Sequence, residues 1–522
     1  MHHGERRSRA SLGAGLLLAL LSLHCAPSRL SGDDDQDMGI GGGDGGGGVL
    51  TCSDRMPCPT GQRCFQSRCV PDRGACCSDN DCQNDTRCTS QAADGGTCGF
   101  CVDYKIGEFD PMCAGQGFSA GEFKAPVDRC RWPAMGRPAA ANVIMTPLVI
   151  DVDGDLRPEI VFAPMTGASG PQNLVAIRGS DCTELYNVPA NLQGFSQIAA
   201  ADLDGDKLPE IVGVLSGAAF GTGRKVAVFN GKTGALLATS VSDYQLTGTD
   251  FDCSGPAIAD VDGDGTPEII VAATVLRWNK AQSRVDIVWS KAAAGGTWGT
   301  LSLANDMDGD GKPEVVAGNR IYDGVTGAEK TPSVLSTVTL GGYAAIGDFN
   351  KDGSADLVYI QSQRGGQQVM VVDVKNNAFL MNPTPIPGGW GGPPTVADFD
   401  GDGKPDFGTA GPRNYYVFSL DCLQNPKPAK CKGATPGVLW QSNTKDASSG
   451  GTASSVFDFN GDGRAEVVYR DECWLRVYNG PNGRSVLAVP ISSETGLEYP
   501  VVADVDGSGH SAIVVPSDSA RD

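Results

Sequence analysis

Residues 257–273 read AIADVDGDGTPEIIVAA, and this stretch decides the fold. Asp260, Asp262, Asp264 and Glu268 stand at positions 1, 3, 5 and 9 of the segment that begins at Asp260. Oxygen-bearing side chains at this spacing converge only if the chain curls tightly around one point. Glycine at positions 4 and 6 permits the left-handed backbone that such a curl needs. Short apolar, β-branched runs on both sides predict a strand before the loop and another after it.

The same motif recurs seven more times, and we number the loops one to eight along the chain. Successive motifs begin 51, 58, 46, 42, 50, 60 and 46 residues apart. Units of this length, with four strand-like runs each, are typical of β-propeller blades. The oxygen-bearing side chains of the other loops are Asp151, Asp153, Asp155 and Glu159; Asp202, Asp204, Asp206 and Glu210; Asp306, Asp308, Asp310 and Glu314; Asp348, Asn350, Asp352 and Asp356; Asp398, Asp400, Asp402 and Asp406; Asp458, Asn460, Asp462 and Glu466; and, in loop eight, Asp504, Asp506 and Ser508, with Ala512 at position 9.

Most of these loops are predicted to hold a Ca²⁺ ion. Four hard oxygens and a backbone carbonyl near position 7 suit a calcium site of six to eight ligands completed by water. A single Asp-Gly loop could equally be a polar turn, but a turn needs no acid at position 9, and seven of the eight copies have one. Crowded carboxylates also repel one another unless a cation lies among them. We expect about five to seven sites, with weaker binding in loops five and seven, where Asn replaces one Asp, and a degenerate loop eight.

These repeats resemble the FG-GAP (VCBS-type) repeat family, which is best known from the propeller of integrin α-subunits. The shared motif, D-x-D/N-G-D-G-x-x-D/E followed by an apolar strand, covers about residues 140–522. The Phe-Gly and Gly-Ala-Pro elements survive only in pieces, at residues 162–164 and 407–408. The resemblance implies an all-β, seven- or eight-bladed β-propeller over residues 142–522. It also implies that the loop carboxylates are metal ligands and that binding partners use other loops.

How the ring closes is left open by the sequence. Only one strand-like run, residues 512–516, follows loop eight, so an eighth blade would lack two strands. The connecting segment 106–141 contains Phe123–Trp132, which could supply a ring-closing strand. A seven-blade ring with shared strands and a chain truncated relative to its family are the alternatives.

The N-terminus predicts export. Three arginines precede the apolar run 12–23, which is too short to span a membrane but suits a signal peptide over residues 1–25. Cys25 follows after His24, in a position that resembles bacterial lipoprotein signals, which are lipidated at a cysteine just after the apolar run; ordinary cleavage nearby is the alternative. Residues 26–50, rich in Gly and Asp, predict a flexible linker. We therefore expect the protein in the outer membrane, at the cell surface or in the periplasm.

Residues 51–105 are predicted to form a small disulfide-rich module. Ten of the 18 cysteines lie between residues 52 and 101, where few large apolar residues could build a core. The pair Cys98 and Cys101 prompts a metal site, but zinc sites usually show two such pairs, and exported proteins favour disulfides. Further along the chain, local bridges are expected between Cys113 and Cys130 and between Cys422 and Cys431, which leaves Cys182, Cys253 and Cys473 unassigned.

The negative net charge of the chain comes from the same motifs. With 41 basic and 62 acidic residues the formal net charge is −21, which argues against nucleic acid as a partner. The eight motifs hold 28 of the acids, so the rest of the chain has 34 acids against 41 bases. The excess acidity therefore belongs to the loops. Contact with a membrane is expected only through an N-terminal lipid anchor.

The residue types present favour binding over catalysis. Of four histidines only His510 lies outside the predicted signal peptide, which excludes Ser–His–Asp triads, Cys–His pairs and His-rich metal sites. We predict an exported, Ca²⁺-stabilised binding or adhesion protein without catalytic activity, whose protein or glycan partner binds on the propeller loops. The alternative is a Ca²⁺-assisted polysaccharide lyase, or another carbohydrate-active propeller enzyme, that uses Lys, Arg or Tyr as its base. The tyrosines considered, Tyr186, Tyr322, Tyr359 and Tyr478, lie in strand-like runs where packing explains them equally well.

Overall fold

The computed structural model describes the repeat region and fragments of the segment before it. It covers residues 126–132, 142–165, 172–217, 224–245, 254–292, 299–338, 341–362, 367–386, 391–446, 449–491, 493 and 495–517, together with residue 60 and five short strands before residue 104. The predicted signal peptide and linker, with Cys25, lie outside the described residues, as do Cys113 and Cys253. In the described part, no helix has the length and apolar character needed to cross a membrane.

The Cys-rich segment contains short antiparallel ladders. Strand β1 (Gln62–Phe65) pairs with β2 (Arg68–Pro71), and β5 (Gly99–Asp103) lies between β3 (Ala75–Cys76) and β4 (Thr86–Cys88).

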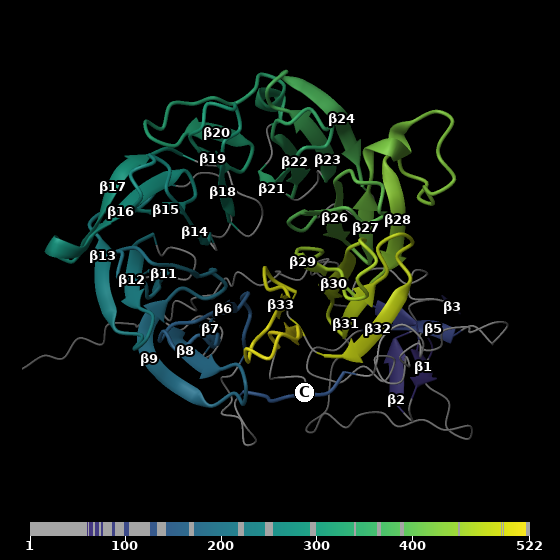
Figure 1. Cartoon of the computed structure of the whole chain (residues 1–522). Helices are drawn as coiled ribbons and strands as arrows, with labels where there is room; N and C mark the ends of the chain where they lie inside the picture. Colours follow the sequence, from purple (N-terminus) through teal and green to yellow (C-terminus); the bar gives the residue numbers. More distant parts are fainter. Residues whose placement is uncertain are drawn as a thin grey trace, which may run out of the picture.

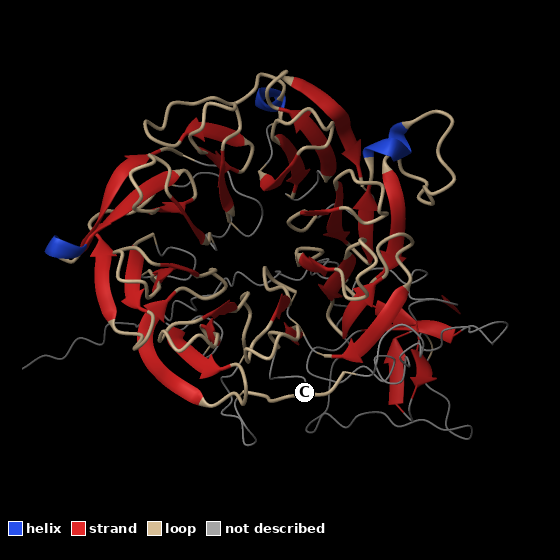
Figure 2. Cartoon of the chain, in the orientation of Figure 1, coloured by secondary structure: helices blue, strands red, loops and turns tan. Residues whose placement is uncertain are grey.

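The other strands form sheets arranged around a ring, which confirms the all-β, propeller-like architecture (Figures 1 and 2). In chain order the units are β6 (Leu148–Ile150), β7 (Glu159–Phe162), β8 (Gln172–Arg178) and β9 (Glu184–Leu192); β10 (Ala199–Ala201), β11 (Glu210–Val214), β12 (Val226–Asn230) and β13 (Leu236–Ser240); β14 (Pro256–Ala259), β15 (Glu268–Val271), β16 (Thr274–Asn279) and β17 (Arg284–Ser290); β18 (Ser302–Asn305), β19 (Glu314–Ala317) and β20 (Arg320–Asp323); β21 (Gly342–Gly347), β22 (Asp356–Gln361), β23 (Gln368–Asp373) and β24 (Ala378–Pro385); β25 (Thr395–Ala397), β26 (Asp406–Gly411), β27 (Asn414–Phe418) and β28 (Val438–Asn443); β29 (Ser454–Phe457), β30 (Glu466–Arg470), β31 (Trp474–Tyr478) and β32 (Ser485–Pro490); and β33 (Val501–Ala503) with β34 (Ala512–Val514). Three short 3-10 helices interrupt the described loops, at Lys280–Gln282, Leu335–Thr337 and Leu420–Leu423.

Every motif connects the first and second strands of its unit, as the sequence predicts. The first strands β6, β10, β14, β18, β21, β25, β29 and β33 are neighbours in this order around the ring, and β33 lies beside β6 (Figure 1). Because equivalent connections lie at the same end of equivalent strands, the eight loops share one edge of the ring. Neighbouring units two and three also join at their outer strands, where β13 pairs in parallel with β17.

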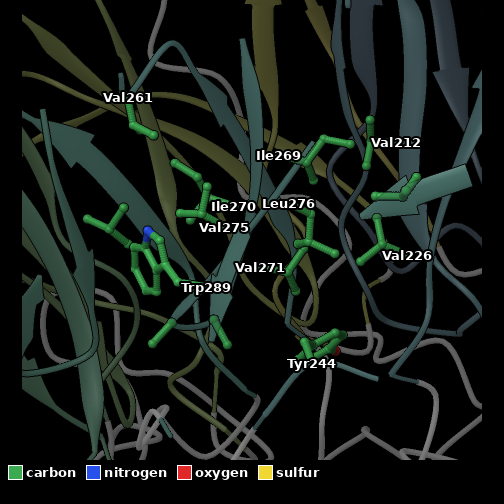
Figure 3. Packing of buried hydrophobic residues seen from close by; sticks show 14 of the residues in the cluster. Val212, Val226, Tyr244, Val261, Ile269, Ile270, Val271, Val275, Leu276 and Trp289 are labelled. Atoms are coloured by element: carbon green, nitrogen blue, oxygen red, sulfur yellow. The ribbon is translucent and has the colours of Figure 1, made fainter. Parts of the chain in front are cut away.

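The core lies between neighbouring units. Figure 3 shows Val212 and Val226 of unit two beside Ile269, Val271 and Leu276 of unit three, all in one buried cluster. The second strands carry continuous apolar runs because both of their faces are covered. The apolar stretch that follows each motif is thus the part that holds neighbouring units together.

The junctions between units repeat one close contact. A glycine in the turn after the third strand packs against the apolar residue at position 2 of the preceding loop. A Cβ atom on Gly324 would lie 2.9 Å from the Cβ atom of Val261, and one on Gly179 would lie 2.0 Å from the carbonyl oxygen of Val505. Since Gly179 belongs to the first unit and Val505 to loop eight, the ring closes with the same packing that joins consecutive units.

Residues 126–132, which we call the strap, add a second connection across this closure. They form no strand, so the predicted ring-closing strand is wrong for the described residues. Instead, Arg129 forms an ion pair with Asp506 of loop eight. The ring of Trp132 meets that of Phe162 in the first unit edge-on, with centroids 4.9 Å apart. The strap therefore contacts both the last and the first unit.

The disulfides correct one prediction and confirm another. Cys130 of the strap is bonded to Cys182, so the predicted pairing of Cys130 with Cys113 is wrong. Cys182 lies in the β8–β9 turn, which the strap crosses, and this proximity cannot be seen in sequence spacing. The bond between Cys422 and Cys431 is confirmed.

Candidate metal centres in the repeat loops

The backbone curl is the same in all eight loops. Residues at positions 4 and 6 have positive φ in every copy, as predicted for the glycines there. The same conformation is adopted by Leu156 (φ 69°), Lys207 (φ 73°) and Lys351 (φ 61°), which are not glycines. A side chain in this region costs roughly 1–2 kcal/mol relative to glycine. The fold therefore imposes the curl even where the residue does not favour it.

The aspartate at position 1 holds the curl together. In loop three, Asp260 Oδ1 accepts hydrogen bonds from the backbone N–H groups of Gly263 (2.7 Å) and Asp264 (3.1 Å), and its Oδ2 accepts one from Gly265 (2.8 Å). Position 3 continues the pattern, because Asp262 Oδ1 accepts from the N–H of Asp264 (3.2 Å). The carboxylates are thus fixed within the loop by its own backbone.

The acid at position 9 enters from the first residue of the second strand. Glu268 Oε2 accepts from the N–H of Val261 at 3.0 Å, and the matching bond occurs in the other six loops that have this acid. These side chains are almost wholly buried; Glu268 is 1% exposed and Asp356 0%. A buried carboxylate is unfavourable unless a cation or further donors compensate it.

In five loops the carboxylates converge closely enough to share one ion. One oxygen from each of three acids lies within 4.8 Å of the others in the groups Asp151, Asp153 and Glu159; Asp202, Asp204 and Asp206; Asp260, Asp262 and Glu268; Asp306, Asp308 and Glu314; and Asp398, Asp400 and Asp406. The predicted ligands that lie in these loops outside such a group are Asp155, Glu210, Asp264, Asp310 and Asp402. Loops five and seven, with Asn350 and Asn460 at position 3, form no such three-acid group among the described residues.

The donor set fits a hard divalent cation. Oδ1 of Asp356 and Oδ1 of Asp406 are buried without a hydrogen-bond partner, which is the state a cation in the loop would relieve. Burial raises the pKa of Asp356 to about 6, that of Glu210 to about 7 and that of Asp406 to about 8. Carboxylate oxygens are the ligands that Ca²⁺ prefers. When bound, the ion would supply charge neutralisation and cross-linking within the loop.

Basic side chains that the sequence analysis did not single out reach the same groups. Arg277 of β16 contacts loop three, Lys330 contacts loop four and Lys430 contacts loop six. For Arg277 a signal existed, because the hairpin that pairs Ile269 with Leu276 places it across from the position-9 acid. For the two lysines, only the three-dimensional arrangement reveals the contact.

The tyrosines named in the lyase alternative are packing residues. Tyr359 and Tyr478 are buried within the ring, and burial raises the pKa of both phenols. The hydroxyl group of Tyr186 donates to the carbonyl oxygen of Gly231 at 2.8 Å, and burial raises its pKa as well. A general base needs a pKa near neutrality, so these shifts run in the wrong direction.

A second charged cluster lies at the opposite edge of the ring, in the connections that follow β28, β30 and β32 and in the adjoining residues of β30 and β31. We call Lys445, Asp446, Arg470, Asp471, Arg476 and Glu498 the far-edge network. Asp471 accepts from the backbone N–H of Lys445 (2.9 Å) and from Arg476 Nε (3.2 Å), while Arg470 lies 3.8 Å from Glu498. Nothing in the sequence pattern predicted this network, because its members come from three separate segments of the chain, residues 445–446, 470–476 and 498.

Comparison with known proteins supports the repeat assignment. The FG-GAP-like repeat family matches residues 348–409. No curated protein matches the sequence. Residues 348–409 are therefore an FG-GAP-like repeat, and they span loops five and six within the propeller-like ring.

Two solved structures show the same fold. The V. cholerae biofilm matrix protein Bap1 aligns with a TM-score of 0.56 at 17% identity, covering 75% of this chain and 88% of that chain. A rhamnogalacturonan lyase from Bacillus licheniformis aligns with a TM-score of 0.50 at 17% identity, covering 73% of this chain and 70% of that chain. At such identity the likeness shows the fold alone, and the two proteins, a biofilm matrix protein and a lyase, differ in kind.

Proposed function

We propose that the chain is an exported, Ca²⁺-stabilised binding protein that acts in adhesion and has no catalytic activity of its own. The observation that carries the proposal is the repeated loop: a fixed backbone curl with a buried position-9 carboxylate whose outer oxygen, in loops five and six, has no partner. Seven such acids around one edge are consistent with a structural role for the ion in seven of the eight units rather than a catalytic role in one. The fold shared with a biofilm matrix protein agrees with this reading.

The partner is proposed to bind at the opposite edge, on the connections that carry the far-edge network. There, Asp446 accepts from the N–H of Ser449 (3.0 Å), and the hydroxyl of Ser449 donates to the carbonyl oxygen of Thr495 (2.6 Å). These bonds join the connection after β28 to the connection after β32. Loops held in this way are suited to present a fixed surface to a protein or a glycan.

Export and membrane attachment remain part of the proposal. Two described disulfides agree with an oxidising compartment. Lipidation of Cys25 would tether the ring to a membrane through the linker 26–50.

Binding of labelled full-length protein to glycan and protein arrays, with Ca²⁺ or with EGTA, tests the proposal. We expect retention of a defined ligand class that depends on Ca²⁺. Equal binding to all features, or the same binding in EGTA, would contradict it.

A polysaccharide lyase is the second candidate, and one observation favours it. Burial lowers the pKa of Lys445 to about 8, the range of a general base, and this lysine lies beside acidic residues of the far-edge network. Absorbance from unsaturated sugar products, measured on acidic polysaccharides with wild type and Lys445→Met, separates the two candidates. If wild type forms unsaturated products and Lys445→Met does not, the protein is a lyase and the binding proposal is wrong.

A further inference from the structure

The outer oxygen of the position-9 carboxylate has a basic partner in some loops of the ring and no partner in another. In loop five its outer oxygen, Asp356 Oδ1, is buried without a hydrogen-bond partner. In loops three and four the matching atoms, Oε1 of Glu268 and Oε1 of Glu314, accept from a basic side chain. The outer oxygen of the position-9 acid is thus paired with a cation in loops three and four and unpaired in loop five.

Arg277 fills this role in loop three. Its Nε donates to Glu268 Oε1 at 2.8 Å, and its terminal nitrogen NH2 lies 2.5 Å from both Glu268 Oε1 and Asp262 Oδ2. The same nitrogen is 3.5 Å from Asp264 Oδ2. The guanidinium group therefore contacts the acids at positions 3, 5 and 9 together.

Lys330 reaches the same three positions in loop four from another part of its unit, beyond β20. Its Nζ is 2.7 Å from Asp308 Oδ2, 2.8 Å from Glu314 Oε1 and 3.6 Å from Asp310 Oδ2. Two different residue types, arriving from different places, converge on equivalent carboxylates. The contact is therefore set by the charge of the loop rather than by one strand geometry.

Loop one provides the contrast within the same ring. Among the described residues, no basic side chain forms an ion pair with Asp151, Asp153, Asp155 or Glu159. The position-9 acid of this loop, Glu159, is buried, with 3% of its surface exposed. Loop one thus has the carboxylate group of a metal centre; Lys232 Nζ reaches the loop but contacts the backbone carbonyl oxygen of Asp153 (3.3 Å), so among the described residues no cation pairs with its carboxylates.

We propose that loops three and four carry their own tethered cations: the Arg277 guanidinium and the Lys330 ammonium neutralise these loops, and a divalent ion gains the position-9 oxygen only by displacing them. Loop one is then filled at low Ca²⁺ concentration, whereas loops three and four stay ordered without the ion and bind it weakly. The proposal concerns the loops alone and does not depend on adhesion.

Calcium titration of the full chain by calorimetry, with melting curves in EGTA, tests this assignment. Arg277→Met and Lys330→Met remove the tethered cations. Arg284→Met and Arg320→Met are matched controls in the same units, because these arginines pair with Asp286 and Glu329 outside the loops.

Each test variant is expected to bind one more tight Ca²⁺ per chain than wild type, at an affinity raised about tenfold or more in the altered loop, and to melt at a lower temperature in EGTA. The controls should behave as wild type in both measurements. Arg277→Lys keeps the charge and should also resemble wild type. If Arg277→Met folds only when Ca²⁺ is present, the proposal is supported, since the ion then replaces the lost cation.

Unchanged Ca²⁺ stoichiometry in both test variants, together with wild-type melting in EGTA, would overturn the proposal. If wild type binds no Ca²⁺ at all, the calcium part of the proposed function fails by itself. The tethered cations are then tested by the melting temperatures in EGTA alone, by comparing Arg277→Met and Lys330→Met with their controls.

Discussion

Loops four and five are consecutive in the chain and share one backbone curl, yet they balance their charge differently. In loop four Lys330 contacts the position-9 acid, whereas in loop five the outer oxygen of Asp356 has no partner. Both acids accept the same bond from the N–H at position 2. The comparison teaches that the curl and the charge balance are separate properties, so each can be changed without the other.

The largest expected effect is a pH dependence that comes from acids without a tethered partner at position 9. The folded pKa values of Asp406 (about 8) and Glu210 (about 7) lie above their ordinary values, so the fold favours the protonated forms. Their stabilising contribution is complete below about pH 4 and is lost as the pH rises through 7 and 8. Without Ca²⁺, unfolding should cost about 7 kcal/mol less at pH 9 than at pH 5.

Urea unfolding in EGTA at pH 5, 7 and 9 measures this loss. The same series in Ca²⁺ is the control, because a bound ion favours the ionised carboxylates and should flatten or reverse the trend. Identical pH profiles with and without Ca²⁺ would show that these acids do not face the ion.

The second prediction compares loops four and five directly. In EGTA at pH 8, Asp356→Asn should raise the free energy of unfolding by about 1–3 kcal/mol, because it removes a buried charge that has no cation. Glu314→Gln should lower it by a similar amount, because Lys330 loses its most buried partner. Urea midpoints of the two variants and wild type give the result. If the free energy of unfolding changes with the same sign in both variants, loops four and five do not differ in how their charge is balanced.

The smallest effect concerns the backbone, which both loops share. Lys351→Gly should stabilise the protein by about 1 kcal/mol, since a lysine with φ 61° is replaced by a residue that adopts this conformation readily. Gly309→Ala, at the same position of loop four, should destabilise it by a similar amount; the added methyl group would meet nothing within 4 Å, so only the backbone changes. Urea midpoints that do not move in opposite directions would indicate that the curl relaxes.

Local sequence was enough to predict the ring and its loops, because the residues within each motif determine the conformation of that motif. The spacing of Asp260, Asp262 and Glu268, with glycine between them, requires a curl between two strands, and the structure has that curl eight times. Glycine at positions 4 and 6 was enough to predict the curl, but the curl also forms without it. Leu156 and Lys351 show that the surrounding bonds impose positive φ on residues that disfavour it.

Features that join distant segments could not be predicted in this way. Cys130 was assigned to Cys113 by proximity along the chain, but the strap crosses the β8–β9 turn and brings it to Cys182. Lys330 reaches loop four only because the chain turns back after β20. Three-dimensional proximity decides such contacts.

The central claim is that the loops whose position-9 acid has no tethered cation need Ca²⁺ to be stable, and the melting temperature of the full chain during an EGTA titration at constant Mg²⁺ tests it most directly. We predict a stepwise fall as Ca²⁺ is withdrawn and full recovery when it is returned. A melting temperature that stays constant across the titration would contradict the account.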